Sequence, residues 1–334
     1  MKRRASKSTL VPHIDPVGQA KRPFWSVMIP TYESGALLEP TLRSVLDQDP
    51  GRDQMQIEVV DDCSTEDPPN PVVDRLARER VHVHRHPVNV GISANFTACV
   101  RRSVGEWVHI LHGDDLVVPG FYERARSVID ANEGVGAVIV GCDVIDHAGS
   151  VIESLESLRA EPGILGDGFV RNLFLHNPIR TPAVIVRRSV YEAIGGFAPT
   201  LSHTADWDMW KRILTTTPTW FDPRVLALYR THEAADTMQA FTSGRSVREE
   251  VASIKLARGY LDAERSAAYT RAGYAAKRRG AWWLARINGD RAGLARRNVY
   301  IRIVAQCLAG EITEGSRRVF QRWARQRGGT LKQS

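Results

Sequence analysis

Residues 111–119 read L-H-G-D-D-L-V-V-P and follow the apolar segment W-V-H-I at residues 107–110. The apolar segment is typical of a buried strand, and Gly113 supplies the turn residue at which such a strand ends. The adjacent carboxylates of Asp114 and Asp115 repel each other unless a cation or hydrogen-bond donors lie nearby. Because aspartate is also a common turn residue, the stretch alone allows two interpretations, a polar turn or half of a divalent-metal site.

The segments around this stretch alternate between strand-like and helix-like patterns. Strands are predicted at 24–30, 56–62, 81–86 and 107–111, with helices at 35–48, 71–80 and 91–103 between them. Further strands are expected at 136–141, 181–188 and 225–232, a hairpin at 143–152, and helices at 120–131 and 205–214. This alternation indicates right-handed βαβ units. The predicted fold is therefore α/β and Rossmann-like, a mainly parallel sheet with helices on both faces, followed by a helical C-terminal region.

Acidic and polar clusters follow three of the predicted strands. Pro30, Tyr32 and Glu33 lie at the end of the first, Asp62 ends the second, and residues 113–115 follow the fourth. Ligands of parallel α/β sheets bind outside the carboxyl ends of the strands. Three such clusters at one edge of one sheet predict a single site.

The charge distribution divides the chain into three regions. The net charge of +7 combines +5 in residues 1–22, −11 in residues 23–244 and +13 in residues 245–334. These regions are predicted to be a flexible basic arm, the sheet domain and a basic helical region. An acidic central region argues against nucleic acid as a partner. The basic ends could contact an anionic membrane surface or an acidic polymer, or they could be solvated without a partner.

The cysteine spacing and the apolar segments indicate the cellular compartment in which the protein is found. The 4 cysteines are far apart and form no C-x-x-C pair, which argues against a disulfide framework or a zinc site and favours a reducing compartment. No segment approaches the roughly 18 consecutive apolar residues of a transmembrane helix, and no apolar stretch follows the basic first residues as in a secretory signal. A cytoplasmic protein is therefore expected, with the inner face of the cell membrane as an alternative if the basic helices around Trp282 and Trp283 bind lipid.

The groups at the predicted edge match the needs of a nucleotide sugar. Its diphosphate needs a hard cation that prefers carboxylate oxygen, which Asp115 can hold while Asp114 contacts the ribose. Tyr32 and Asp62 suit the nucleobase. An acceptor hydroxyl needs a base on the face opposite the leaving diphosphate, and Asp206 at the start of a predicted helix is the candidate. The helix dipole would lower the pKa of Asp206, whereas partial burial would oppose that effect.

Six segments occur in an order and spacing that resemble a known family. They read S-V-M-I-P-T-Y-E, V-V-D-D-C-S-T-E-D, N-V-G-I-S-A-N, L-H-G-D-D-L-V-V-P, I-G-G-F and A-D-W-D-M-W-K-R-I. Over about residues 24–235 the chain resembles family-2 inverting glycosyltransferases of the GT-A fold. The resemblance implies transfer of a sugar from a nucleoside-diphosphate donor, with Mn²⁺ or Mg²⁺. The implied acceptor is a glycan or lipid-linked hydroxyl, in polysaccharide, glycolipid or glycoconjugate biosynthesis of the cell envelope.

The resemblance also implies roles for individual residues. The nucleotide-sugar site would be formed by strand ends and the loops that follow them: Pro30, Tyr32, Glu33, Asp62, Asn89 and Asp114. Asp114 and Asp115 would form the D-x-D-type pair, with Asp115 on the metal. His232 matches a position that approaches the metal or the diphosphate, and Asp206 matches the catalytic base.

Two departures from the family pattern keep other interpretations open. Ala205 stands where many members have an acidic residue before the base, and Cys63 stands where Gly or Asn is common. The missing acid is the only support for a non-catalytic scaffold. A sugar nucleotidyltransferase would normally carry a glycine-rich basic loop after the first strand, but T-Y-E-S-G-A-L-L at residues 31–38 contains neither Lys nor Arg.

Overall fold

The computed structural model describes residues 11–18, 21–231, 240, 245–262, 264–269, 271 and 273. The chain divides into two compact units. The first comprises Met1–Gly166 and Ile179–Glu233, and the second comprises Asp167–Pro178 and Ala234–Ser334. The sheet lies in the first unit, so the predicted site residues within the described ranges belong to that unit as well.

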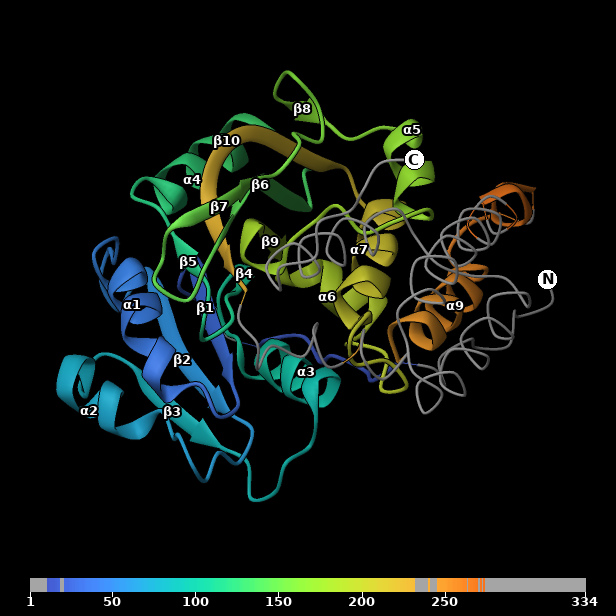
Figure 1. Ribbon diagram of the computed structural model, residues 1–334. Helices are drawn as coiled ribbons and strands as arrows, with labels where there is room; N and C mark the ends of the chain where they lie inside the picture. The colour runs from blue at the N-terminus through green and yellow to red at the C-terminus, as the bar shows by residue number, and fades with distance from the viewer. Residues whose placement is uncertain are drawn as a thin grey trace, which may run out of the picture. The chain divides into compact units, whose positions relative to one another are not determined.

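Four parallel strands form the N-terminal half of the sheet (Figure 1). They are β1 (Trp25–Thr31), β2 (Met55–Asp61), β3 (His82–Arg85) and β4 (Trp107–Ile110), in the spatial order β3-β2-β1-β4. The helices between them are α1 (Gly35–Leu46), α2 (Asn70–Ala77) and α3 (Ile92–Arg102). Because βαβ crossovers are right-handed, α1 and α2 cover one face while α3, which leads back across β2 and β1, covers the other. Every residue of β1 is buried as a result.

The remaining strands make the sheet mixed. The order continues β4-β9-β6-β10-β5, through β9 (Val184–Arg187), β6 (Ala137–Ile145), β10 (Thr219–Arg230) and β5 (Leu116–Val117). β9 runs antiparallel to both neighbours, and β10 is parallel to β6. β7 (Val151–Ser154) returns along β6 as the predicted hairpin, and β8 (Gly163–Ile164) pairs with β10. The predicted α/β fold is confirmed, with parallel pairs among the first four strands and both antiparallel pairs and the parallel β6–β10 pair beyond them.

A proline residue accounts for one difference from the predicted boundaries. β10 begins at Thr219 and not at 225, because the strand continues through Pro223 with irregular register between Asp222 and Val225. Such irregularity is the usual way a strand accommodates proline. Helix α1 begins at Gly35, as predicted, and contains Pro40.

Three further helices belong to the first unit. They are α4 (Phe121–Ala131), α6 (Arg188–Ile194) and α7 (Ala205–Thr216), and the short 3-10 turn Thr181–Ala183 precedes β9. Helix α7 is buried on several sides, with Trp207 and Trp210 almost completely enclosed. The rigid setting of α7 fixes the position of Asp206 in its first turn.

Residues 11–18 depart from the flexible arm that was expected over residues 1–22. The side chain of Ile14 is completely buried. The carbonyl of Pro12 accepts a hydrogen bond from the Gly196 amide at 2.8 Å, and the Arg188 guanidinium donates to the Asp15 carbonyl at 3.0 Å. The composition of the segment indicated mobility, but one apolar anchor and backbone hydrogen bonds hold it against the first unit.

In the second unit, the described elements are α5 (Asp167–Leu173), α9 (Arg245–Ala257) and further helical residues up to 273. Phe174 and Tyr269 pack edge to face with ring centroids 5.3 Å apart. The helices predicted beyond residue 273, including Trp282 and Trp283, lie outside the described residues. In the part of the chain that the structure describes, no helix has the length and apolar composition needed to cross a membrane.

Candidate active site

The turns after β1, β2 and β4 meet at one edge of the sheet because these strands are neighbours in the order β2-β1-β4. The Asp62 amide donates to the Thr31 carbonyl at 2.9 Å, and the Gly113 amide donates to the Pro30 carbonyl at 3.1 Å. A Cβ atom on Gly113 would lie 2.6 Å from the Thr31 side chain, so only glycine permits this approach. The structure thus brings together the three clusters that follow the predicted strands.

His112, Asp114 and Asp115 form a compact group of ionisable side chains at the end of β4. One ligand atom from each lies within 4.8 Å of the others. Asp115 is completely buried, and its Oδ1 accepts a hydrogen bond from the Arg230 amide at 2.8 Å. Its Oδ2 has no hydrogen-bond partner and lies 3.4 Å from Nδ1 of His112. Asp114 is half-buried.

The electrostatics of this group favour a bound cation. Burial raises the pKa of Asp115 well above its usual value because it disfavours the charged carboxylate. The nearby Asp114 raises this pKa further because two close negative charges repel each other. Burial lowers the pKa of His112, which keeps its imidazole neutral and able to act as a ligand. Two carboxylates and an imidazole around an unsatisfied carboxylate oxygen are a donor set that fits a divalent cation.

Asp206 lies half-buried in the first turn of α7. Burial raises the pKa of its carboxyl, while a 2.6 Å hydrogen bond from the Trp207 amide and the charges of His203, His112 and Arg180 act in the opposite direction. Burial outweighs the lowering influences, so the carboxylate is a stronger base than an exposed aspartate. The mutual electrostatic influence of His112 and Asp206 indicates that the His112–Asp114–Asp115 group and Asp206 lie near each other.

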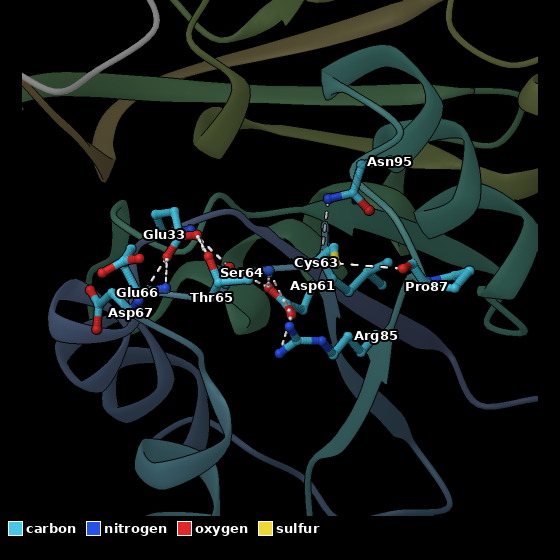
Figure 2. Close-up of polar contacts among 11 residues, drawn as sticks. Glu33, Asp61, Cys63, Ser64, Thr65, Glu66, Asp67, Arg85, Pro87 and Asn95 are labelled. Atoms are coloured by element: carbon cyan, nitrogen blue, oxygen red, sulfur yellow. Dashed lines mark hydrogen bonds and ion pairs between the residues drawn. The ribbon is translucent and has the colours of Figure 1, made fainter.

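Glu33 is engaged by the loop after β2 (Figure 2). Its carboxylate accepts hydrogen bonds from the amides of Thr65 at 2.7 Å, Glu66 at 3.0 Å and Asp67 at 2.7 Å. These bonds, chiefly that of Thr65, lower the pKa of Glu33. Glu33 thereby holds the loop that borders the site, and Pro30, inside buried β1, shapes the site through its backbone carbonyl.

Asp62 organises the loop that follows β3. Its two carboxylate oxygens accept hydrogen bonds from the Val90 amide at 2.7 Å and the Gly91 amide at 2.9 Å. Asn89, the preceding residue, is exposed. Tyr32 is 54% exposed, which leaves its ring available to stack on a flat ligand.

The backbone of the turn between Asp61 and Ser64 shows why Gly or Asn would suit the position of Cys63. Cys63 has φ = 65°, a left-handed conformation that Gly and Asn adopt most readily. Asp61 braces this turn, accepting a 2.5 Å hydrogen bond from the Ser64 hydroxyl and lying 3.5 Å from the Arg85 guanidinium (Figure 2). A non-glycine residue in this region is a form of backbone strain that often occurs at ligand sites.

Two arginines at the site were not singled out from the sequence. The Arg230 guanidinium donates to the carbonyls of Asp114 at 2.8 Å, Asp146 at 2.8 Å and His147 at 2.7 Å. Arg180 lies over the Tyr229 ring at 5.6 Å, and its charge lowers the pKa of both Asp115 and Asp206. The only available signal was their position beside predicted strand ends. His232, in contrast, lies outside the described residues.

The fold and the edge of acidic residues define the class of protein. Residues 26–195 match the sequence model of glycosyl transferase family 2, which is half of the chain. The chain belongs to glycosyl transferase family 2 and is a glycosyltransferase of the GT-A fold. The matched region runs from β1 to the end of α6 and includes the His112–Asp114–Asp115 group.

Relatives and solved structures agree with this placement. An uncharacterized protein of Mycobacterium tuberculosis is 28% identical, with 68% of this chain aligned to 73% of that protein. An uncharacterized glycosyltransferase of Haemophilus influenzae is 24% identical, with 57% of this chain aligned to 61% of that protein. A crystal structure of S. aureus TarS 1-349 in complex with UDP-GlcNAc superposes with a TM-score of 0.64 at 16% identity, covering 85% of this chain and 80% of that one.

Proposed function

We propose that the chain transfers a sugar from a nucleoside-diphosphate sugar to an acceptor hydroxyl with inversion, and that it requires a divalent cation. The observation that carries the proposal is the pairing of Asp206, a half-buried carboxyl with a raised pKa, with the His112–Asp114–Asp115 group. The first supplies a base, and the second supplies cation ligands. UDP is the first nucleotide to test, because the similar TarS structure holds UDP-GlcNAc.

Four of the predicted residues have a direct task in this proposal. Asp206 accepts the proton of the acceptor hydroxyl while that oxygen attacks the anomeric carbon and the bond to the diphosphate breaks on the opposite face. The bound cation supplies charge neutralisation for the departing diphosphate. Tyr32 stacks on the base, Asp62 holds the loop around the base and ribose, and Asp114 contacts the ribose or the cation.

The acceptor side of the proposal is a glycan or lipid-linked hydroxyl. Arg180 lowers the pKa of Asp206 through its positive charge. This charge favours the ionised form of Asp206, in opposition to burial, and would also attract an anionic acceptor. Sugar transfer to a panel of neutral and anionic glycan acceptors would show whether an anionic acceptor is preferred.

The deciding experiment replaces the proposed base. Asp206→Asn removes the proton acceptor and preserves the shape, so we expect donor binding to be kept and transfer to fall by roughly 10³-fold or more. Donor affinity is measured by calorimetry with Mn²⁺, and transfer by release of nucleoside diphosphate. Asp130→Asn, an exposed aspartate paired with Arg126, serves as the matched control and should transfer at the wild-type rate.

Two results would contradict the proposal. Near-wild-type turnover by Asp206→Asn would exclude Asp206 as the base. Absence of any donor cleavage by the wild-type protein with Mn²⁺ and all common nucleotide sugars would favour the non-catalytic scaffold instead.

A further inference from the structure

Two buried polar atoms at the end of β4 lack hydrogen-bond partners in the described residues. They are Nε2 of His112 and Oδ2 of Asp115. Buried polar atoms are nearly always satisfied in native proteins, because leaving one unpaired costs about 1–3 kcal/mol. Of the two, Oδ2 of Asp115 lies beside Nδ1 of His112 and points to a cation that completes this part of the site when bound, whereas Nε2 is the other ring nitrogen and is not part of this contact.

The distance between the two side chains fits one shared ion. Nδ1 of His112 lies 3.4 Å from Oδ2 of Asp115. Two adjacent ligand atoms at about 2.1 Å from the same small divalent ion lie about 3 Å apart when they subtend a right angle. A ligand atom of Asp114 lies within 4.8 Å of both, so the three side chains can reach one ion with small movements.

The imidazole of His112 is held in this orientation by its surroundings. Its ring stacks on Phe96 of α3, with centroids 5.1 Å apart and an interplanar angle of 19°. Phe96 packs in turn on Phe197 at 5.2 Å. Because the aromatic pair holds the ring on one face, Nδ1 is already turned toward Oδ2 of Asp115, and metal binding would need little reorganisation of the imidazole.

We propose that His112 is a nitrogen ligand of the cation and that the site therefore selects Mn²⁺ over Mg²⁺. The inference rests on the proposed function, whose cation it makes specific. Carboxylates bind both ions well, but Mg²⁺ strongly prefers oxygen ligands in ideal octahedral geometry, whereas imidazole favours transition metals. One nitrogen ligand among two carboxylates accordingly shifts the preference toward Mn²⁺.

The test uses the full chain with Mn²⁺, alone and with UDP. Pulsed electron paramagnetic resonance of bound Mn²⁺ should show nitrogen coupling from an imidazole in the wild type and lose it in His112→Gln. His13→Gln, which changes a histidine with 75% side-chain exposure, is the matched control and should keep the coupling. Transfer activity is not needed for this measurement.

Metal competition gives a second readout. We expect the wild type to bind Mn²⁺ more tightly than Mg²⁺, and His112→Asp, with an all-oxygen set, to reduce that ratio on the order of tenfold. If His112→Asp does not fold by circular dichroism, His112→Asn replaces it. An unchanged ratio in a folded variant overturns the inference.

The outcomes separate this inference from the proposed function. Mn²⁺ that binds and supports transfer without nitrogen coupling would overturn the role of His112 and leave the transferase intact. Absence of Mn²⁺ binding together with metal-independent transfer would show that His112 and Asp115 form a direct pair, which overturns both the ligand role and the metal requirement. Absence of transfer despite Mn²⁺–imidazole coupling would contradict the proposed reaction alone.

Discussion

Asp206 is the residue at which the local charges matter most for chemistry. Its first-turn position in α7 and the Trp207 amide favour the carboxylate, but burial has the larger effect and raises the pKa. An aspartate of ordinary pKa, about 3.9, would stay ionised through the whole range in which most proteins are folded. The raised pKa moves protonation of Asp206 to higher pH than that of an exposed aspartate.

The pH dependence of transfer follows from this shift. A general base works only when it is deprotonated, so kcat at saturating donor and Mn²⁺ should fall as pH drops through the raised pKa of Asp206. Arg180→Gln removes a charge that lowers this pKa, and the acid limb of the profile should move to higher pH. Asp130→Asn should leave the profile unchanged. If the acid limb of the Arg180→Gln profile stays in place or moves to lower pH, the assignment of Asp206 as the base is contradicted.

At the scale of elements, strand β10 connects two parts of the site. Its last residue, Arg230, binds the Asp115 side chain through its amide and the Asp114 carbonyl through its guanidinium. The same guanidinium donates to Asp146 and His147 at the tip of the β6–β7 hairpin. The turn that carries the cation ligands is therefore braced against the hairpin by one side chain that is 3% exposed.

Replacement of Arg230 tests this brace. Arg230→Gln leaves three part-buried carbonyls without their donor, so we expect a stability loss of about 1–3 kcal/mol together with weaker Mn²⁺ affinity. Arg230→Lys should recover little, because an ammonium cannot reproduce the planar fork that reaches three carbonyls. The measurements are urea denaturation and Mn²⁺ titration. Arg224→Gln, a 57% exposed arginine of the same strand, is the control and should change neither. Wild-type Mn²⁺ affinity in a folded Arg230→Gln would exclude the brace as a determinant of the site.

Across the whole molecule, charge is distributed very unevenly. Residues 245–334 carry a net +13, whereas residues 23–244 carry −11. Each Lys or Arg near an anionic bilayer contributes about 1 kcal/mol of attraction, and salt screens that attraction within about 10 Å at 0.1 M. A peripheral contact with the membrane through the basic region is therefore a prediction of the charge pattern.

Vesicle sedimentation tests the membrane contact. The full chain should bind vesicles containing phosphatidylglycerol at low salt and dissociate from them at high salt. It should not bind neutral phosphatidylcholine vesicles. Replacing Lys277, Arg278 and Arg279 with Gln should weaken the binding, whereas replacing exposed Arg126 should not. Equal binding to neutral and anionic vesicles, or none to either, would contradict the prediction.

The order of secondary structure and the edge that carries the site were predictable from local sequence. Apolar segments such as Trp25–Thr31 are long enough to be buried strands, and helical spacing separates the segments. The rule that ligands bind at the carboxyl ends of parallel strands then located Asp62, Asp114 and Asp115 together. The antiparallel placement of β9 was not predictable, because strand pairing depends on contacts distant in sequence.

The sequence by itself determined the α/β class, the family and the acidic residues of the site, because these depend on local periodicity and on motifs of consecutive residues. Tertiary structure decided which of those acids are buried and what surrounds them. Arg230 meets Asp115 across 115 residues of chain, and His112 is oriented by Phe96 on a different helix. Burial and long-range pairing set the pKa of Asp115 and leave its Oδ2 without a hydrogen-bond partner. Burial and pairing depend on residues distant in sequence, so the residues adjacent to Asp115 do not predict them.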